Sequence, residues 1–135
     1  MTVHHEKLAI ATEKKETTVD VTPRVRAAVT RSKVREGICV VSAAHTTAGL
    51  FVNENADNDV RRDLLHRLSK IIPNDDDYRH AEGNSPAHIK ATLVGNAVTL
   101  SVHEGELALG TWQGIYFAEF DGPRERSATV TVIGD

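Results

Sequence analysis

The segment YRHAEGNSPAHIK, residues 78–90, gathers polar side chains that a hydrophobic core does not need. His80 and His88 are eight positions apart, and Ser85-Pro86 between them predicts a helix start, because proline favours the first helical turn. A loop histidine and a first-turn histidine can reach one ion, although the spacing is not the four-residue pair of helical zinc motifs. The segment therefore predicts a site with two imidazoles.

A third histidine, His45, follows the apolar run GICVVSAA and so lies at a predicted strand end, where functional side chains concentrate. Taken alone, His45 is explained as well by a hydrogen bond to its own loop. The only cysteine, Cys39, lies in the apolar run and is expected to be a buried, inert thiol. A set of three histidines without thiolates is more typical of catalytic than of structural zinc.

Carboxylates and amides crowd the segment FVNENADNDV, residues 51–60. Helix capping explains one of them, because the macrodipole and free N–H groups stabilise carboxylates near a helix N-terminus. Asn53, Glu54 and Asp57 together also suit a hard cation such as Mg²⁺, which prefers several oxygen ligands. Both interpretations stay open.

The segment DGPRERS, residues 121–127, places Arg124 and Arg126 after a turn, at alternate strand positions that face the same way. Two guanidinium groups on one side can bind a phosphate in bidentate fashion, although a solvated arginine pair is the commoner arrangement. The remaining histidines lack comparable neighbours and are interpreted as ordinary surface or strand residues: His4, His5, His66 and His103.

Hydrophobic periodicity predicts the strands that carry these side chains. HEKLAIATE and TTVDVT alternate as strands do, and the charged residues between them predict an N-terminal hairpin. GICVVSAAH predicts a strand buried on both faces, and AGLFVNEN predicts the next strand. From residue 96 onwards the chain reads as short strands separated by glycines and by the turn DGP.

Three amphipathic segments predict helices among these strands. One starts at Thr22-Pro23 and stops at Gly37, one covers 57–72, and one runs from Ser85-Pro86 to Gly95. Strand-rich ends around three helices predict an α+β fold, with a sandwich-like mixed or antiparallel β-sheet and about three covering helices. We expect a single domain over residues 1–135.

Charge and hydropathy exclude two classes of partner. The formal charge of −3 argues against nucleic-acid binding, because phosphate backbones require a basic face. No apolar run approaches the roughly 20 residues that span a bilayer, and the first residues lack the apolar core of a signal peptide. We therefore expect a cytoplasmic protein that binds neither nucleic acid nor membrane.

Three segments resemble the YjbQ-like family, whose members are described as secondary thiamine-phosphate synthase enzymes: HTTAGLFVNENAD, HAEGNSPAHIKATLVG and LALGTWQGIYFAEFDGPRER. The resemblance covers nearly the whole chain, and its most specific part, LGTWQGIY, contains the only tryptophan. It implies an α+β fold, a homotrimer, and polar pockets at or near subunit contacts. The characteristic positions that it implies are His45, Asn53, Glu54, Asp57, His80, Asn84, His88, Trp112, Gln113 and Glu119.

The first functional hypothesis is the synthase reaction, which joins a hydroxymethylpyrimidine diphosphate to a thiazole phosphate. The expected catalytic residues are Glu54, Asp57, His45 and Glu119, with Mg²⁺ on the first two. Substrate binding is assigned to Asn53, Asn84, Trp112, Gln113, Arg124 and Arg126. Trp112 has two interpretations, stacking on the pyrimidine or packing in the core or at a subunit contact.

Two other hypotheses remain. A hydrolase would hold a divalent metal, zinc, on His45, His80 and His88, with Glu54 or Glu119 as general base. A homotrimeric binding protein would capture a small phosphorylated metabolite without turnover.

Overall fold

The computed structural model describes residues 1–135, which form eight strands and three helices. The strands are β1 (Thr2–Ala11), β2 (Thr17–Asp20), β3 (Gly37–Ser42), β4 (Ala48–Glu54), β5 (Ala97–His103), β6 (Glu106–Leu107), β7 (Gln113–Glu119) and β8 (Glu125–Gly134). The helices are α1 (Thr22–Ser32), α2 (Asn58–Ile71) and α3 (Ser85–Val94). None of the three is long and apolar enough to cross a lipid bilayer.

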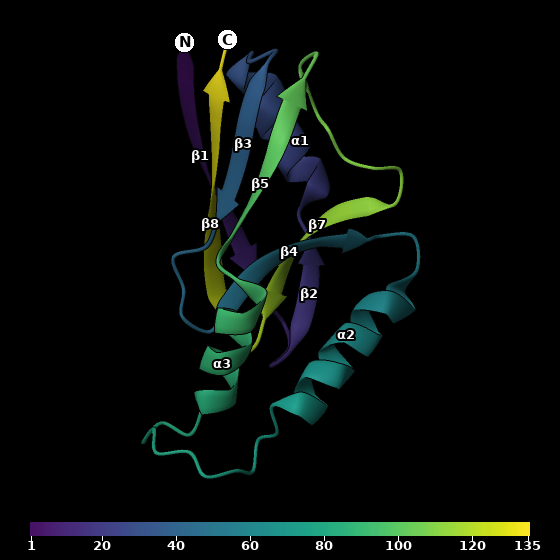
Figure 1. The fold of residues 1–135 in the computed structure, drawn as a ribbon. Coiled ribbons are helices and arrows are strands. Elements are labelled where there is room, and N and C mark those ends of the chain that lie inside the picture. Colours follow the sequence, from purple (N-terminus) through teal and green to yellow (C-terminus); the bar gives the residue numbers. More distant parts are fainter.

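The strands form two sheets, drawn in Figure 1. The larger sheet has the order β1-β8-β3-β5-β6, and the smaller has the order β2-β7-β4. Every pairing is antiparallel. The prediction of an α+β fold with antiparallel sheets and three helices is confirmed.

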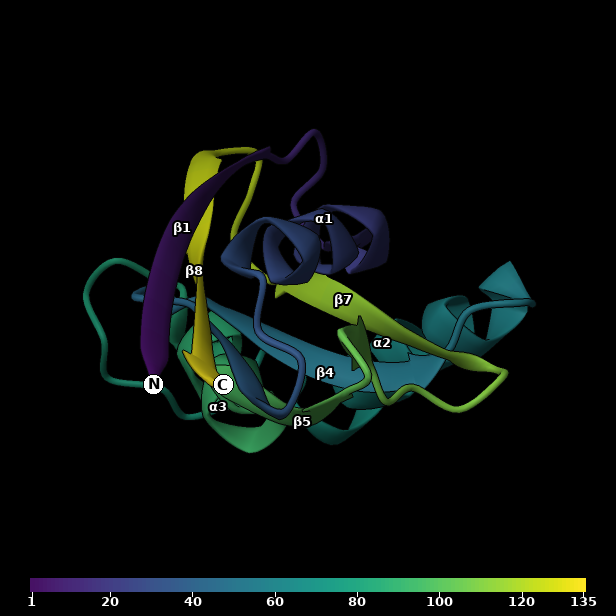
Figure 2. The same cartoon turned by 90° about the horizontal axis from the view of Figure 1, so that it is seen from above.

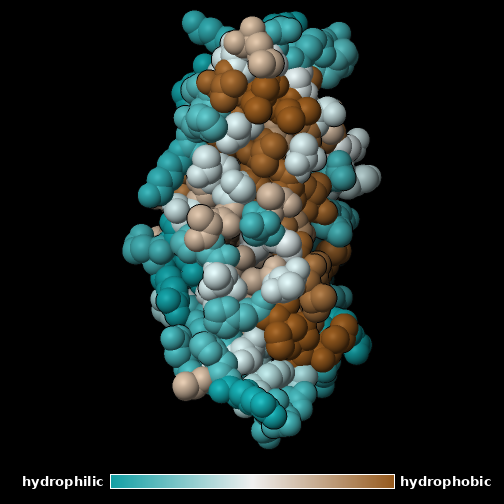
Figure 3. All heavy atoms as spheres, turned by 60° about the vertical axis from the view of Figure 1, so that its left-hand side comes forward, coloured by the Kyte–Doolittle hydropathy of each residue, from teal (hydrophilic) through white to brown (hydrophobic).

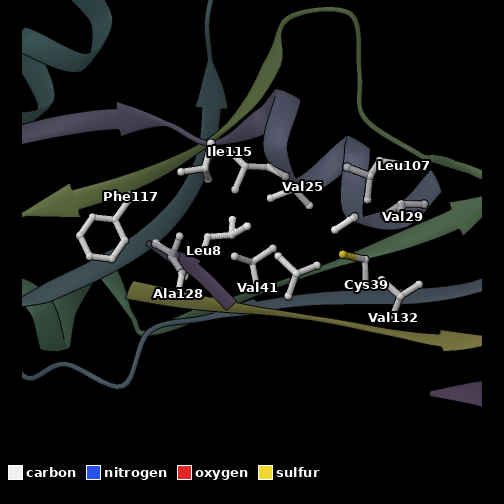
Figure 4. Packing of buried hydrophobic residues seen from close by; sticks show 14 of the residues in the cluster. Leu8, Val25, Val29, Cys39, Val41, Leu107, Ile115, Phe117, Ala128 and Val132 are labelled. Atoms are coloured by element: carbon white, nitrogen blue, oxygen red, sulfur yellow. The ribbon is translucent and has the colours of Figure 1, made fainter. Parts of the chain in front are cut away.

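The main core lies between α1 and the inner face of the larger sheet, and Figure 2 shows α1 over that face. Val25 of α1 and Val41 of β3 are fully buried there, and Phe117 of β7 extends the core to the smaller sheet (Figure 4). Cys39 is also fully buried, as the sequence predicted, and burial raises the pKa of its thiol to about 11.

The helix boundaries follow local backbone chemistry. Helix α3 starts at Ser85 with proline in its first turn and stops before Gly95, as predicted. Helix α1 ends earlier than Gly37, because Lys33 already adopts a left-handed conformation with φ of 62°. The N-cap of α2 is Asp57, whose carboxylate accepts a hydrogen bond from the backbone N–H of Asp59 at 2.9 Å. Capping therefore accounts for Asp57.

Two sequence predictions about strands are wrong. The N-terminal hairpin does not exist, because β1 pairs with β8 and β2 pairs with β7 in the other sheet. Strand β3 is not buried on both faces: its inward Cys39 is fully buried, whereas Ile38 on the opposite face is 43% exposed. Its apolar outer face has no covering element within one chain.

A buried polar network joins the two sheets at the turn between β7 and β8. Glu119 of β7 accepts hydrogen bonds from Nε and Nη2 of Arg126 in β8, and Oγ1 of Thr12 donates to it at 2.7 Å. Arg126 Nη2 also donates to Oγ1 of Thr47 at 2.8 Å. Burial opposes ionisation of Glu119, but the hydrogen bonds from Arg126 and Thr12 outweigh it and lower the pKa of the carboxyl.

We predict that Glu119→Gln destabilises the fold by about 3 kcal/mol at neutral pH, because it leaves the Arg126 charge buried without its partner. A carboxyl with a lowered pKa stabilises the native state above its ordinary value of 4.5 and loses this contribution as pH falls through the folded pKa. Urea denaturation should therefore show a difference between parent and variant that narrows below about pH 4.5.

A double variant, Glu119→Leu with Arg126→Met, is the control, because it removes both charges and should recover part of the lost stability. If Glu119→Gln alone is as stable as the parent at pH 7, the conclusion that this ion pair holds the two sheets together is wrong.

Candidate functional site

The three predicted histidines meet in one pocket of about 420 Å³, here called the histidine pocket. His45 enters it from the loop between β3 and β4, His80 from the loop before α3, and His88 from the first turns of α3. The full lining is Ala44, His45, Thr46, Thr47, His80, Glu82, Asn84, His88, Arg124 and Arg126. Both predicted arginines therefore lie at the same site as the histidines.

His45 is fixed by a backbone hydrogen bond. Strand β3 ends at Ser42, so it no longer pairs with β8 at Ser127, and the N–H of Ser127 donates to Nε2 of His45 at 3.1 Å. Burial, together with the charges of Arg126 and Arg124, lowers the pKa of the imidazole. A neutral ring that accepts at Nε2 carries its proton on Nδ1, so His45 offers a ligand an N–H donor.

His80 and His88 face each other across the pocket. Their ring centroids are 5.2 Å apart and the rings are perpendicular. The proline of Ser85-Pro86 sets the start of α3 and so places His88 one turn into the helix, opposite the loop that carries His80. The sequence spacing of eight residues thus does bring these two imidazoles together, as predicted.

The pocket is only partly suited to binding a metal ion. Three imidazoles are appropriate zinc ligands by chemistry. However, no group of three or more His, Cys, Asp or Glu side chains converges closely enough to hold a metal ion. The Nε2 of His45 is already used by Ser127, so the arrangement favours hydrogen-bond donation over coordination.

Both arginines are held in place by carboxylates. Arg124 donates from Nε to the backbone carbonyl of Asp121 at 2.7 Å and from Nη2 to its carboxylate at 2.8 Å. Arg126 donates from Nε and Nη2 to the carboxylate of Glu119, and from Nη2 also to Oγ1 of Thr47. Each guanidinium keeps its Nη1 group free of hydrogen bonds within the protein, and two such groups can bind one anion.

Asp121 is a site residue that the sequence interpretation missed. Its carboxylate accepts from Arg124 and also from Nδ2 of Asn84 at 2.9 Å. The Oδ1 atom of Asn84 is buried and has no hydrogen-bond partner. An acid three positions before Arg124 was the available signal, because a turn brings such a pair into contact.

A second hollow of about 480 Å³ adjoins the histidine pocket and shares His45, Thr46 and His88 with it. Small residues form the rest of its wall: Ala48, Ala91, Thr92, Gly95 and Asn96. No lysine, arginine or carboxylate lines this hollow. The two hollows thus differ in their lining: the histidine pocket contains both arginines, and the second hollow contains none.

Glu119, another predicted catalytic residue, pairs with Ala48 at the near end of β4 and is bonded to Arg126. The remaining predicted site residues lie at the opposite end of β4, where the smaller sheet ends: Asn53, Glu54, Asp57, Trp112 and Gln113. Glu54 pairs with Gln113 in the β4–β7 ladder, and the N–H of Asn55 donates to the carbonyl of Trp112 at 2.8 Å. The indole of Trp112 is 63% exposed, and Oε2 of Glu54 is buried without a partner. A seven-residue strand measures about 20 Å, so this end cannot reach the histidine pocket of its own chain.

Comparisons with known proteins show to which protein family the chain is related. A family model described as UPF0047 protein YjbQ-like matches residues 6–135. A UPF0047 protein of Methanocaldococcus jannaschii is 51% identical over 129 residues, which cover 96% of this chain and 94% of that protein. The UPF0047 protein YugU of Bacillus subtilis is 43% identical over 128 residues, covering 94% and 97%.

Solved structures match equally well along the whole fold. A crystal structure of an uncharacterized YjbQ/UPF0047 protein from Clostridium acetobutylicum has a TM-score of 0.93 at 49% identity and covers 95% of this chain and 99% of that one. A protein of unknown function from Sulfolobus solfataricus has a TM-score of 0.95 at 33% identity and covers 98% of both chains. The chain belongs to the YjbQ-like UPF0047 family.

Proposed function

We propose that the chain is a transferase that joins two phosphorylated substrates, acting as a thiamine-phosphate synthase in the cytoplasm. The observation that carries this proposal is the pair of adjoining hollows with His45 and His88 in their common wall. A hydrolase needs room for one substrate and water, whereas a joining reaction needs two organic groups side by side. The substrates implied by the family resemblance are hydroxymethylpyrimidine diphosphate and thiazole phosphate.

The chemistry defines what the pocket must do. The carbon–oxygen bond between the pyrimidine methylene and the diphosphate breaks, and the thiazole nitrogen supplies the electron pair of the new carbon–nitrogen bond. Diphosphate leaves with the electrons of the broken bond. The barrier therefore depends on how well negative charge is stabilised on the departing oxygen, and this is the task of fixed hydrogen-bond donors.

The histidine pocket offers such donors at suitable positions. Arg124, Arg126 and His45 line this pocket, and the Nη1 groups of both arginines make no hydrogen bond within the protein. The Nδ1–H of His45 is likewise free to donate, because Nε2 accepts from Ser127. The three side chains are held by hydrogen bonds to other protein groups. They therefore need little reorganisation as negative charge develops on the departing oxygen. One preorganised donor of this kind contributes on the order of 3 kcal/mol to the barrier.

We predict that Arg124→Ala lowers the rate of thiamine-phosphate formation about a hundredfold, because one donor to the leaving diphosphate is lost. The rate is measured with both substrates and Mg²⁺ by separating thiamine phosphate chromatographically. Arg124 is 52% exposed, so the melting temperature should stay within a few degrees of the parent.

The matched control is Arg67→Ala, which removes an exposed arginine of α2 that lines neither hollow. It should leave the rate unchanged. Formation of thiamine phosphate at no more than the protein-free rate by the parent chain would exclude the synthase proposal.

Hydrolysis with a bound divalent metal is the second candidate, and the meeting of three imidazoles in one pocket favours it. Zinc bound there would polarise a substrate oxygen or activate water. His45 would first have to release the N–H of Ser127. Glu82, which lines the same pocket, is the carboxylate closest in sequence to these ligands.

For this candidate we predict that untagged protein contains about one zinc per chain, and that His88→Ala lowers it tenfold or more while the fold stays intact. Elemental analysis after dialysis against a weak chelator measures the zinc, and thermal unfolding reports the fold. His103→Ala, which removes an exposed strand histidine outside the pocket, is the control. Zinc-free parent protein that retains synthase activity would remove the hydrolase candidate.

We further propose that three copies of the chain associate through the outer face of the larger sheet. Helix α1 covers the opposite face (Figure 2), and Figure 3 shows a band of hydrophobic residues along the uncovered side. Alternation along the strands places mostly small, hydroxyl-bearing and apolar residues there, with one lysine: Val3, His5, Lys7, Ala9, Ile38, Val40, Ser42, Ser127, Thr129, Thr131 and Ile133. Such a face is suited to burial by another copy.

Association of several copies also decides whether Glu54 and Asp57 can take part in the proposed reaction. These predicted Mg²⁺ ligands, with Asn53, Trp112 and Gln113, lie about 20 Å from the histidine pocket along β4. They can therefore contribute to the proposed reaction only if a neighbouring copy presents them. The unpartnered Oε2 of Glu54 leaves its carboxylate free to bind a cation or a substrate group.

We predict a solution mass of three times the 14.7 kDa chain by light scattering at micromolar concentration. Ile38→Asp, which places a charge in the middle of the outer face, should shift the mass towards one chain because a buried unpaired carboxylate is costly. Thr30→Asp on the exposed side of α1 should leave the mass unchanged. A parent protein of monomeric mass would remove any role for a neighbouring copy.

A further inference from the structure

A cleft of about 760 Å³ lies between α2 and the smaller sheet and is separate from the histidine pocket. Figure 1 shows α2 lying alongside β2, and the segment before β2 contributes Lys14 and Glu16 to the lining of the cleft. No lining residue is shared with the two hollows of the candidate site. The lining is Lys14, Glu16, Thr17, Thr18, Asp20, Asn58, Arg61, Arg62, Leu65, His66, Ser69 and Tyr116.

One wall of the cleft carries unpaired basic side chains. Arg62 and His66 are one turn apart on α2 and therefore project from the same side of the helix, and Lys14 approaches from the turn. All three are exposed, and none takes part in an ion pair or a side-chain hydrogen bond. Arg61 is engaged differently, because its guanidinium lies 4.5 Å over the ring of Tyr116.

The two acids of the cleft are already engaged by protein groups. Glu16 accepts from Nζ of Lys90 at 3.0 and 3.2 Å, and Lys90 is only 2% exposed. Asp20 accepts from the backbone N–H of Thr22 at 2.9 Å. Because Glu16 is neutralised from inside the protein, the basic wall is left without a matching number of free carboxylates. The cleft therefore favours an anion.

Hydroxyl and amide groups line the remainder of the cleft. Thr17 and Thr18 of β2 and Asn58 and Ser69 of α2 are among the lining residues, and only Leu65 and Tyr116 are hydrophobic. Lysine and arginine bind phosphate oxygens through charge-assisted hydrogen bonds, and hydroxyl-bearing walls suit a polar organic body. The volume falls in the range of about 300–1,000 Å³ that small-molecule sites occupy.

We infer that this cleft is a second binding site, for a phosphorylated small molecule, with Arg62, Lys14 and His66 around the phosphate. The site is independent of the proposed synthase reaction. Its ligand lies against Arg61, which donates to the backbone carbonyl of Glu54 at 2.8 Å. Arg61 therefore links the cleft to the backbone of Glu54.

The test uses inorganic pyrophosphate as the probe and ¹⁵N-labelled protein at constant ionic strength. Saturable shifts of the backbone amides of Thr17, Thr18 and residues 61–66 are expected. Arg62→Ser should weaken this binding about tenfold or more, since one charge-assisted contact is lost. Arg67→Ser, which removes an exposed arginine of the same helix outside the cleft, should not weaken it.

The histidine pocket is followed in the same spectra. Arg124→Ala should abolish the pyrophosphate-dependent shifts around His45 and His88 and leave those of the cleft unchanged. Binding at each of the two sites is therefore tested separately. The inference is overturned if the cleft amides show no saturable shifts at millimolar pyrophosphate. It is also overturned if Arg67→Ser weakens binding as much as Arg62→Ser, because the attraction is then a general effect of helix charge.

Discussion

The buried ion pair between Glu119 and Arg126 is the interaction on which both sheets and the candidate site depend. Removing two charges from water costs several kcal/mol for each ion, and only a complete set of hydrogen bonds offsets that cost. Thr12, Thr47 and the backbone N–H of Asp121 complete the set. Four separate segments of the chain must therefore come together before either charge is satisfied, so the pair specifies how β7 and β8 meet.

The same arrangement explains how the pocket can attract anions in a chain of net negative charge. Arg124 and Arg126 are each neutralised by a carboxylate, so the pocket does not rely on excess positive charge. The groups left to contact an anion are hydrogen-bond donors with fixed directions: one Nη1 group from each guanidinium and one N–H from His45. Donors fixed in this way stabilise developing charge without having to reorient, and their strength depends little on the overall charge of the protein.

The sequence predicts those features that depend on neighbouring residues. The start of α3 at Ser85-Pro86 and its stop at Gly95 follow from local backbone chemistry, and both are found in the structure. Of the two interpretations left open for the acids before α2, capping is the one that the structure shows for Asp57. The convergence of His80 and His88 follows from that helix start. The N-terminal hairpin was predicted wrongly because alternation identifies strands but not their partners, and β1 pairs with residues more than a hundred positions away.

The site was less predictable where a residue acts through another. Asp121 does not line the histidine pocket, and only the fold reveals that its carboxylate accepts from both Asn84 and Arg124. The sequence also groups Glu54 with the histidines as functional residues. A strand of seven residues separates them within one chain, and this distance becomes apparent only when residues 48–54 are seen to form one continuous strand.

Helix α3 shows how closely site and scaffold are combined, because His88, Ile89 and Lys90 follow one another and point in three directions. Successive helical residues differ by about 100°, so residues two apart lie on nearly opposite sides. Lys90 is buried and bonded to Glu16 and Ser69, whereas His88 lines the pocket and Ile89 is 39% exposed. The buried lysine fixes the rotation of the helix about its axis. The orientation of His88 towards His80 is therefore set by an ion pair on the far side of the same turn.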